Sequence, residues 1–132
     1  MTIELTMLAY ATALLVVLVL IQATVGVQSK GLVPLAGHRD DVGPATGFHA
    51  RMLRVVDNHR EGLTMFAPVI LIAALANLNN SYTALGAQLF FWSRLVHAIL
   101  YIVGVPMIRP LAWAVGVAGT VLVLLADVGI LH

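Results

Sequence analysis

The sequence predicts an all-α membrane protein, a bundle of four transmembrane helices. Two observations predict this fold class. The 132-residue chain is 61% hydrophobic and only 10% charged, whereas a soluble domain of this length needs a larger polar surface. Its apolar residues also gather in four long runs, which are separated by residues typical of loops, such as Gly31, Pro34 and Asn77.

The lengths of these runs define the expected membrane spans, because a helix needs about 20 apolar residues to cross the hydrocarbon core. We expect spans at residues 4–28, 47–78, 81–104 and 109–131, within a single domain that covers residues 1–132. The second span differs from the others because a polar segment precedes its apolar part. We expect that polar segment to be helical and to extend the span.

The expected helix ends carry suitable residues. Asn80 or Ser81 is a good N-cap for the third span. Pro110 falls in the first turn of the fourth span, where a missing N–H costs nothing. Pro68 lies inside the second span, and a membrane helix tolerates it as a kink because neighbouring groups satisfy the freed carbonyl.

The basic residues predict the orientation of the chain. Most of them follow the first span or precede the fourth, and the loop between the second and third spans has none. By the positive-inside rule, both termini lie outside and the two basic loops lie in the cytoplasm. The basic residues that follow the first span and precede the apolar part of the second are Lys30, Arg39, Arg51, Arg54 and Arg60, and Arg109 lies at the start of the fourth span.

Composition also excludes several functions. The formal net charge of +1 argues against a nucleic-acid partner. The absence of cysteine excludes disulfides, thiolate metal sites and a cysteine nucleophile, so any thiol must arrive with a ligand. The histidines have no spacing that suggests a metal site.

The polar segment that begins the second span carries a stripe of polar residues. Arg51, Arg54, Asn58 and Glu61 are three, four and three residues apart, so on a helix they fall within roughly 80° of arc. This stripe combines cations, an amide and a carboxylate, as a polar ligand site would. The alternative is an interfacial helix whose arginines meet lipid phosphates.

The third span carries a second polar stripe formed by Arg94, His97 and Tyr101. Arg94 lies near the middle of the apolar run, where an unpaired cation costs a few kcal/mol or more. It should therefore face the bundle interior or a wet cavity. A structural ion pair with an acid on a neighbouring helix, such as Glu61, is the alternative to direct ligand contact.

Together these motifs resemble the MAPEG family, the membrane-associated proteins of eicosanoid and glutathione metabolism. One carrier of the resemblance is Arg54-x-x-x-Asn58-x-x-Glu61 at the entrance to the second span. The other is Arg94-x-x-His97-x-x-x-Tyr101, followed by Arg109. The segment Gly-His-Arg-Asp-Asp at residues 37–41, followed by Gly47, resembles the short bacterial branch of the family. This resemblance implies a multi-pass protein of the bacterial cytoplasmic membrane.

The resemblance implies a homotrimer with glutathione bound between subunits in a pocket that opens to the cytoplasm. Glutathione would be the thiol co-substrate, and lipophilic substrates would arrive through the lipid bilayer. Arg109 matches the family's catalytic arginine, which lowers the pKa of the thiol. The matching glutathione-binding residues are Arg51, Arg54, Asn58, Glu61, Arg94, His97 and Tyr101.

The predicted function is therefore a glutathione-dependent transferase or peroxidase that acts on lipophilic electrophiles. Two alternatives remain open. One is a diverged, non-catalytic scaffold or ligand-binding protein of the same fold. The other is a small multidrug transporter, which requires a carboxylate deep in the first span, whereas the only acid there is Glu4 at its edge.

Overall fold

A computed structural model describes all 132 residues, and it confirms the all-α prediction. The chain contains five helices and no strand. Four helices are long and one is a short helix within the first loop, which the sequence analysis did not predict. The helices are α1 (Ile3–Lys30), α2 (Leu32–Ala36), α3 (Gly47–Leu75), α4 (Ser81–Val103) and α5 (Arg109–Asp127).

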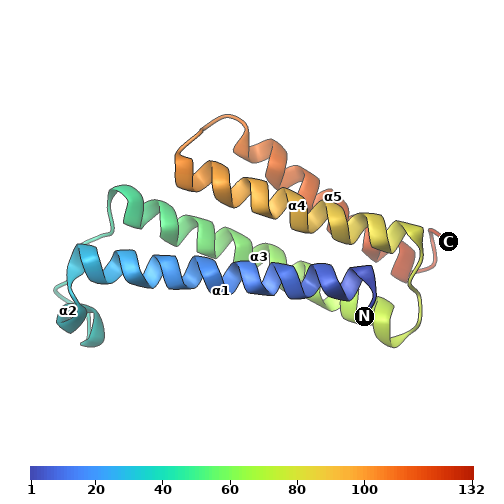
Figure 1. Ribbon diagram of the computed structural model, residues 1–132, viewed down its shortest axis with the longest axis horizontal. Helices are drawn as coiled ribbons and strands as arrows, with labels where there is room; N and C mark the ends of the chain where they lie inside the picture. Colours follow the sequence, from blue (N-terminus) through green and yellow to red (C-terminus); the bar gives the residue numbers. More distant parts are fainter.

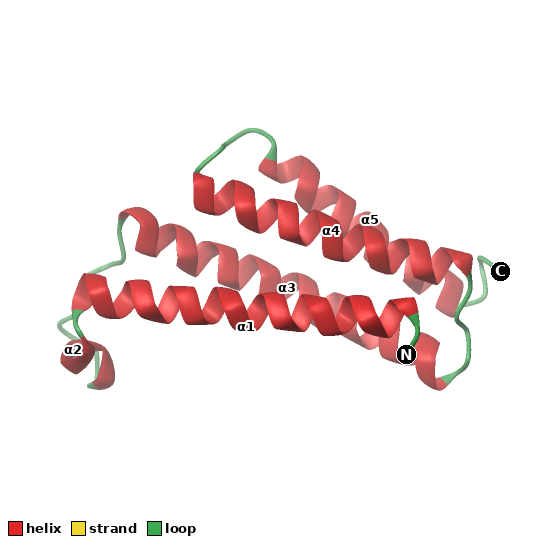
Figure 2. Cartoon of the chain, viewed as in Figure 1, coloured by secondary structure: helices red, strands yellow, loops and turns green.

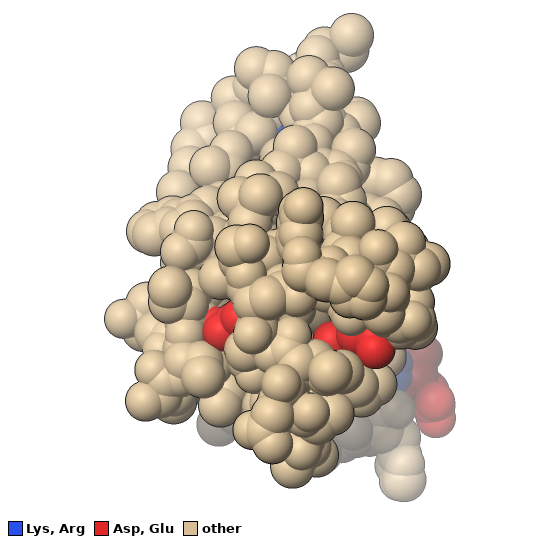
Figure 3. Space-filling view, turned by 90° about the vertical axis from the view of Figure 1, so that its right-hand side faces the viewer, with Lys and Arg blue, Asp and Glu red and all other residues tan.

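The long helices form two pairs, with α1 beside α3 and α4 beside α5 (Figures 1 and 2). Both termini and the α3–α4 loop lie at one end of the bundle, whereas α2 and the α4–α5 loop lie at the other (Figure 1). Figure 3 looks onto the terminal end, where acidic atoms show in two small patches and almost no Lys or Arg is visible. Lysine and arginine are therefore concentrated toward the opposite half.

Three of the long helices, α1, α4 and α5, are long and apolar enough to cross a membrane. The remaining long helix, α3, has 29 residues but begins with the polar segment that holds both arginines of the first stripe. Its length therefore exceeds what a crossing needs, while its average composition is less apolar than that of its neighbours.

Local sequence explains where these helices begin. The Asn80 side chain accepts hydrogen bonds from the backbone N–H groups of Tyr82 and Thr83, and Thr83 Oγ1 accepts one from the N–H of Asn80, which completes a capping box. This confirms Asn80 as the N-cap of α4. Pro110 lies in the first turn of α5, and Pro68 lies inside α3, both as predicted.

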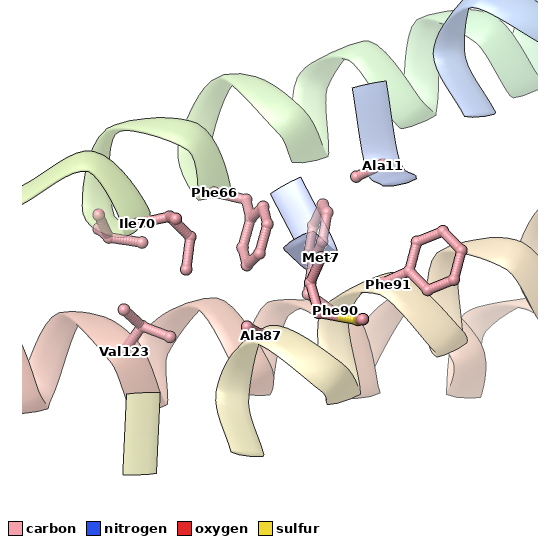
Figure 4. Close-up of a cluster of buried hydrophobic side chains, with 9 residues drawn as sticks. Met7, Ala11, Phe66, Ile70, Ala87, Phe90, Phe91 and Val123 are labelled. Atoms are coloured by element: carbon pink, nitrogen blue, oxygen red, sulfur yellow. The ribbon is translucent and has the colours of Figure 1, made fainter. Parts of the chain in front are cut away.

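An apolar core joins the four long helices in the half of the bundle near the termini (Figure 4). At its centre the rings of Phe66 and Phe90 stack, with 3.9 Å between their centroids. Met7 and Ala11 from α1 and Val123 from α5 close the cluster. The core thus fixes α3 against α4, which sets the position of the polar side chains one or two turns further along both helices.

The backbones of α4 and α5 approach each other closely at two glycines. A Cβ atom placed on Gly86 would lie 2.5 Å from the carbonyl oxygen of Gly119, and one on Gly119 would lie 2.5 Å from that of Gly86. Neither backbone atom can move away without separating the helices. Small residues at such crossings are typical of membrane helix pairs.

Gly86→Leu should therefore destabilise the protein, because the new side chain forces α4 away from α5. We expect a loss of about 1–3 kcal/mol in the free energy of unfolding, the usual cost of overpacking. Ala118→Leu is the matched control, since Ala118 is exposed on α5 next to Gly119. Unfolding in detergent, monitored by circular dichroism, measures the stability of both variants. Equal stability of the two variants would show that the contact is unimportant.

Candidate functional site

The site begins with the buried cation on α4. Arg94 is only 2% exposed, and its Nη2 donates a hydrogen bond of 2.5 Å to Oδ1 of Asn58 on α3. The bond joins the two predicted polar stripes. Because an amide oxygen is neutral, this bond leaves the positive charge of Arg94 without a balancing carboxylate at contact distance.

Small residues make room for this arginine. A Cβ atom on Gly116 of α5 would lie 3.3 Å from Cδ of Arg94 and 2.9 Å from the hydroxyl of Ser93. On the α3 side, a Cβ atom on Gly62 would lie 3.7 Å from Nε of Arg94. The side chain of Arg94 therefore passes between two helices that present glycine to it, so the guanidinium is held in one place.

In front of Asn58 lies an open groove of about 570 Å³, which we call the Arg109 groove. Its size is within the range of small-molecule sites. Residues from α3, α4, α5 and the α4–α5 loop contribute to its wall. They are Asn58, His97, Tyr101, Pro106, Met107, Arg109, Pro110 and Trp113.

Aromatic stacking orders one wall of the Arg109 groove. The guanidinium carbon of Arg109 lies 4.3 Å from the centroid of the Tyr101 ring, within the range of a cation–π interaction. The imidazole of His97 also lies beside Tyr101, with 5.2 Å between the centroids of the two rings. Tyr101 thus positions Arg109, although Arg109 begins a different helix.

A second buried histidine lies near this site, and the sequence analysis did not select it. His59 of α3 is 1% exposed, and its Nε2 is 2.8 Å from the carbonyl oxygen of Ala11 in α1. Around this site, three buried nitrogen atoms have no hydrogen-bond partner within the protein: Nδ1 of His59, Nδ1 of His97 and Nε of Arg94. Polar atoms of this kind normally bind water or a ligand.

The other residues of the first stripe lie outside the Arg109 groove. Arg54 and Glu61 are exposed on the surface of α3. Arg51 is half-buried, with its guanidinium 5.5 Å from the ring of Phe48 and close to Gly104, where a Cβ atom would lie 2.6 Å from its Nη1. Gly104 ends α4, so Arg51 is placed where the negative end of a helix dipole favours a cation.

The alternative ion pair between Arg94 and Glu61 does not form. Within 4.0 Å, the only ion pair in the chain joins the exposed residues Arg60 and Asp57. The single chain therefore brings together Asn58, Arg94, His97, Tyr101 and Arg109, and leaves Arg54 and Glu61 on its surface. Among the groove residues not selected from the sequence, Trp113 had a usable signal, since it lies one turn after Arg109 on the same helix.

The donors of this site are cationic or neutral, which suits an anionic ligand better than a metal cation. Arg109 can bind a carboxylate or lower the pKa of an acid held beside it. Asn58 can both donate and accept hydrogen bonds. The arrangement can therefore hold a small, charged, peptide-like molecule at the cytoplasmic side predicted from the loop charges.

Comparison with known proteins agrees with the resemblance in the sequence. The family model described as MAPEG family matches residues 7–128 of the chain. No curated protein matches significantly, and no solved structure does either. The match covers α3, α4 and α5 in full and all of α1 except its first four residues, and it includes every residue of the site.

A double-mutant cycle tests the bond between Asn58 and Arg94. Asn58→Ala should lower the free energy of unfolding by about 1.5–3 kcal/mol, because it removes a hydrogen bond to a buried charged group. Once Arg94→Leu has removed the charge, the same change should cost less, with a coupling of about 0.5–3 kcal/mol. Additive losses would mean that the two side chains do not interact. The exposed Thr64→Ala provides the baseline.

Proposed function

The chain belongs to the MAPEG family, which includes glutathione-dependent transferases and peroxidases, and we propose that it is such an enzyme, acting on lipophilic electrophiles. The observation that carries the proposal is the contact of Arg109 with Tyr101 in a groove walled by Asn58 and His97. An arginine fixed at the edge of a polar groove is suited to hold a thiol as its anion.

The residue types match the groups of glutathione, which has two carboxylates, an ammonium and a thiol. Arg51 and Arg54 would bind carboxylates as planar forks. Glu61 would meet the ammonium, and Asn58 would pair with a peptide group. Arg94 would hold Asn58 in position and add positive potential, because it is buried directly behind that amide.

The surface position of Arg54 and Glu61 supports a site shared between subunits. These side chains lie on the same helix as Asn58 but outside the groove of their own chain. A neighbouring subunit packed on α3 would enclose them together with a ligand. We therefore propose a homotrimer, as the resemblance implies, with the thiol bound between protomers.

Membrane placement completes the proposal. The three apolar helices contact lipid, and α3 would supply a fourth crossing, with its polar first half facing the subunit interface. The excess of basic residues at the α2 end would place that end in the cytoplasm of a bacterial inner membrane and both termini outside. The Arg109 groove would then open toward cytoplasmic glutathione.

In this site Arg109 stabilises the thiolate, since a guanidinium beside a thiol lowers a pKa that is otherwise about 8.5. The thiolate sulfur forms a bond to the electrophilic carbon of an activated alkene or an epoxide in the lipophilic substrate. The π bond or C–O bond at that carbon breaks as the new bond forms, and the atom that receives its electron pair takes up a proton from solvent. His97 and Tyr101 would line the space in which the thiolate meets the substrate. The substrate would reach it from the lipid.

Two other functions, a scaffold and a multidrug transporter, can be distinguished from the enzyme. A scaffold of the same fold would bind no thiol ligand, so calorimetry at millimolar glutathione separates it from the enzyme. A multidrug transporter would need a proton-exchanging acid inside the bundle. Glu4 is buried, but it lies in the first turn of α1 and accepts a hydrogen bond from Thr83, which favours a structural role.

Glutathione binding by surface variants of α3 tests the shared site. Arg54→Ala and Glu61→Ala should each weaken binding by about 10–150-fold in calorimetry, the loss expected for a hydrogen bond to a charged group. The mass of the oligomer should not change. Arg60→Ala is the matched control, because Arg60 is exposed on the same helix and pairs with Asp57. Unchanged binding in both test variants would refute the proposal.

The role of Arg109 has its own signature. Arg109→Gln should raise the pKa of the bound thiol toward about 8.5, because the nearby cation is lost. Ultraviolet absorbance of the thiolate during a pH titration measures this pKa. Tyr101→Phe keeps the ring that holds Arg109 and should leave the pKa unchanged. A thiol pKa that is the same with and without Arg109 would remove this residue from the chemistry.

A further inference from the structure

A second site lies at the end of α1 and shares no residue with the Arg109 groove. Between the last turns of α1, the short helix α2 and the first turns of α3 is a cavity of about 430 Å³, which we call the α1–α2 pocket. Its walls are mostly apolar. Ala23 and Val27 contribute from α1, and Leu32 and Leu35 contribute from α2.

Positive charge gathers at the mouth of the α1–α2 pocket. Lys30 donates a hydrogen bond of 3.1 Å to the carbonyl oxygen of Pro44, and Nε of Arg39 donates one of 2.6 Å to that of Leu35. Neither cation has a carboxylate within 4.0 Å. Both side chains are therefore anchored through backbone carbonyls, and neither forms an ion pair.

An unpartnered polar side chain also points to a ligand. His49 lines the α1–α2 pocket, is only 8% exposed, and has a buried Nδ1 with no hydrogen-bond partner. Its ring packs against Gly26, where a Cβ atom would lie 3.2 Å from Nε2. A buried imidazole nitrogen of this kind is costly unless water or a ligand bonds to it.

A polar groove of about 660 Å³ lies next to the α1–α2 pocket. The two spaces share Lys30 and Arg39, and the polar groove adds the carboxylates of Asp40 and Asp41. A molecule that spans both spaces would need an apolar part, then an anionic group beside the cations, and then hydroxyl donors for the carboxylates.

The location identifies the source of such a molecule. α1 is long and apolar enough to cross a membrane, and the pocket lies where it ends at Lys30. Leu32 and Val33 on α2 are 66% and 82% exposed, as expected for side chains that dip into a lipid surface. The pocket is therefore placed at the level of the lipid headgroups.

We propose that the α1–α2 pocket binds an anionic phospholipid with a hydroxyl-bearing headgroup, such as phosphatidylglycerol. Acyl methylenes lie against the apolar wall, the phosphate lies between Lys30 and Arg39, and the glycerol hydroxyls face Asp40 and Asp41. The bound lipid fixes α2 and the first loop against α3. This inference does not depend on the thiol site.

The test uses the full-length, delipidated protein in detergent and native mass spectrometry with short-chain dioctanoyl lipids. Phosphatidylglycerol should bind at least tenfold more tightly than phosphatidylcholine, and free glycerol phosphate should not bind. Lys30→Gln and Arg39→Gln should each weaken phosphatidylglycerol binding about fivefold, the effect of one cation near an anionic headgroup. Ala23→Phe should weaken phosphatidylglycerol binding further, because the larger side chain would occupy the space along the apolar wall.

Arg60→Gln is the control, because it removes an exposed cation of α3 that lines neither space. Circular dichroism of each variant verifies that the helices are intact, and the comparison of lipids in the unmodified protein needs no variant. Equal affinity for the two phospholipids would overturn the proposal. So would a loss of phosphatidylglycerol binding in Arg60→Gln as large as that in Lys30→Gln and Arg39→Gln. Glutathione binding should be unchanged in Ala23→Phe; its loss would show that the pocket belongs to the thiol site.

Discussion

The burial of Arg94 is the constraint on which the rest of the structure depends. A cation in the apolar part of a bundle costs a few kcal/mol or more unless polar groups surround it. Here the amide of Asn58 accepts a hydrogen bond from its guanidinium, and Gly62 and Gly116 leave space for its side chain. Three helices therefore have to meet at fixed positions around one residue.

This constraint links packing to function. Because Asn58 is bonded on one side to Arg94, its other hydrogen-bonding capacity faces the Arg109 groove. The apolar core at the Phe66–Phe90 stack fixes α3 against α4, and the polar site follows one or two turns away on the same helices. The apolar core thus supports an adjacent, open, cationic groove, an arrangement suited to orienting a small anionic ligand.

Much of this organisation was predictable, because it depends on local patterns. The capping residue Asn80, Pro110 in a first turn and the two polar stripes follow from helix geometry and spacing. The partner of Arg94 was not predictable, because Asn58 and Glu61 lie one turn apart on the same stripe and only the packing of α3 selects between them. The bond from His59 to the Ala11 carbonyl was missed because a backbone acceptor has no sequence signature. α2 was missed because its five residues lie between glycines and include Pro34.

An electron cryomicroscopy map of the protein in lipid nanodiscs with millimolar glutathione would show whether the buried Arg94 organises the thiol site. We expect a trimer with Arg94 inside each bundle, bonded to Asn58, and ligand density that reaches Arg109 and the Arg54 of an adjacent protomer. A map in which Arg94 faces lipid, or in which the ligand binds away from the Arg109 groove, would contradict it.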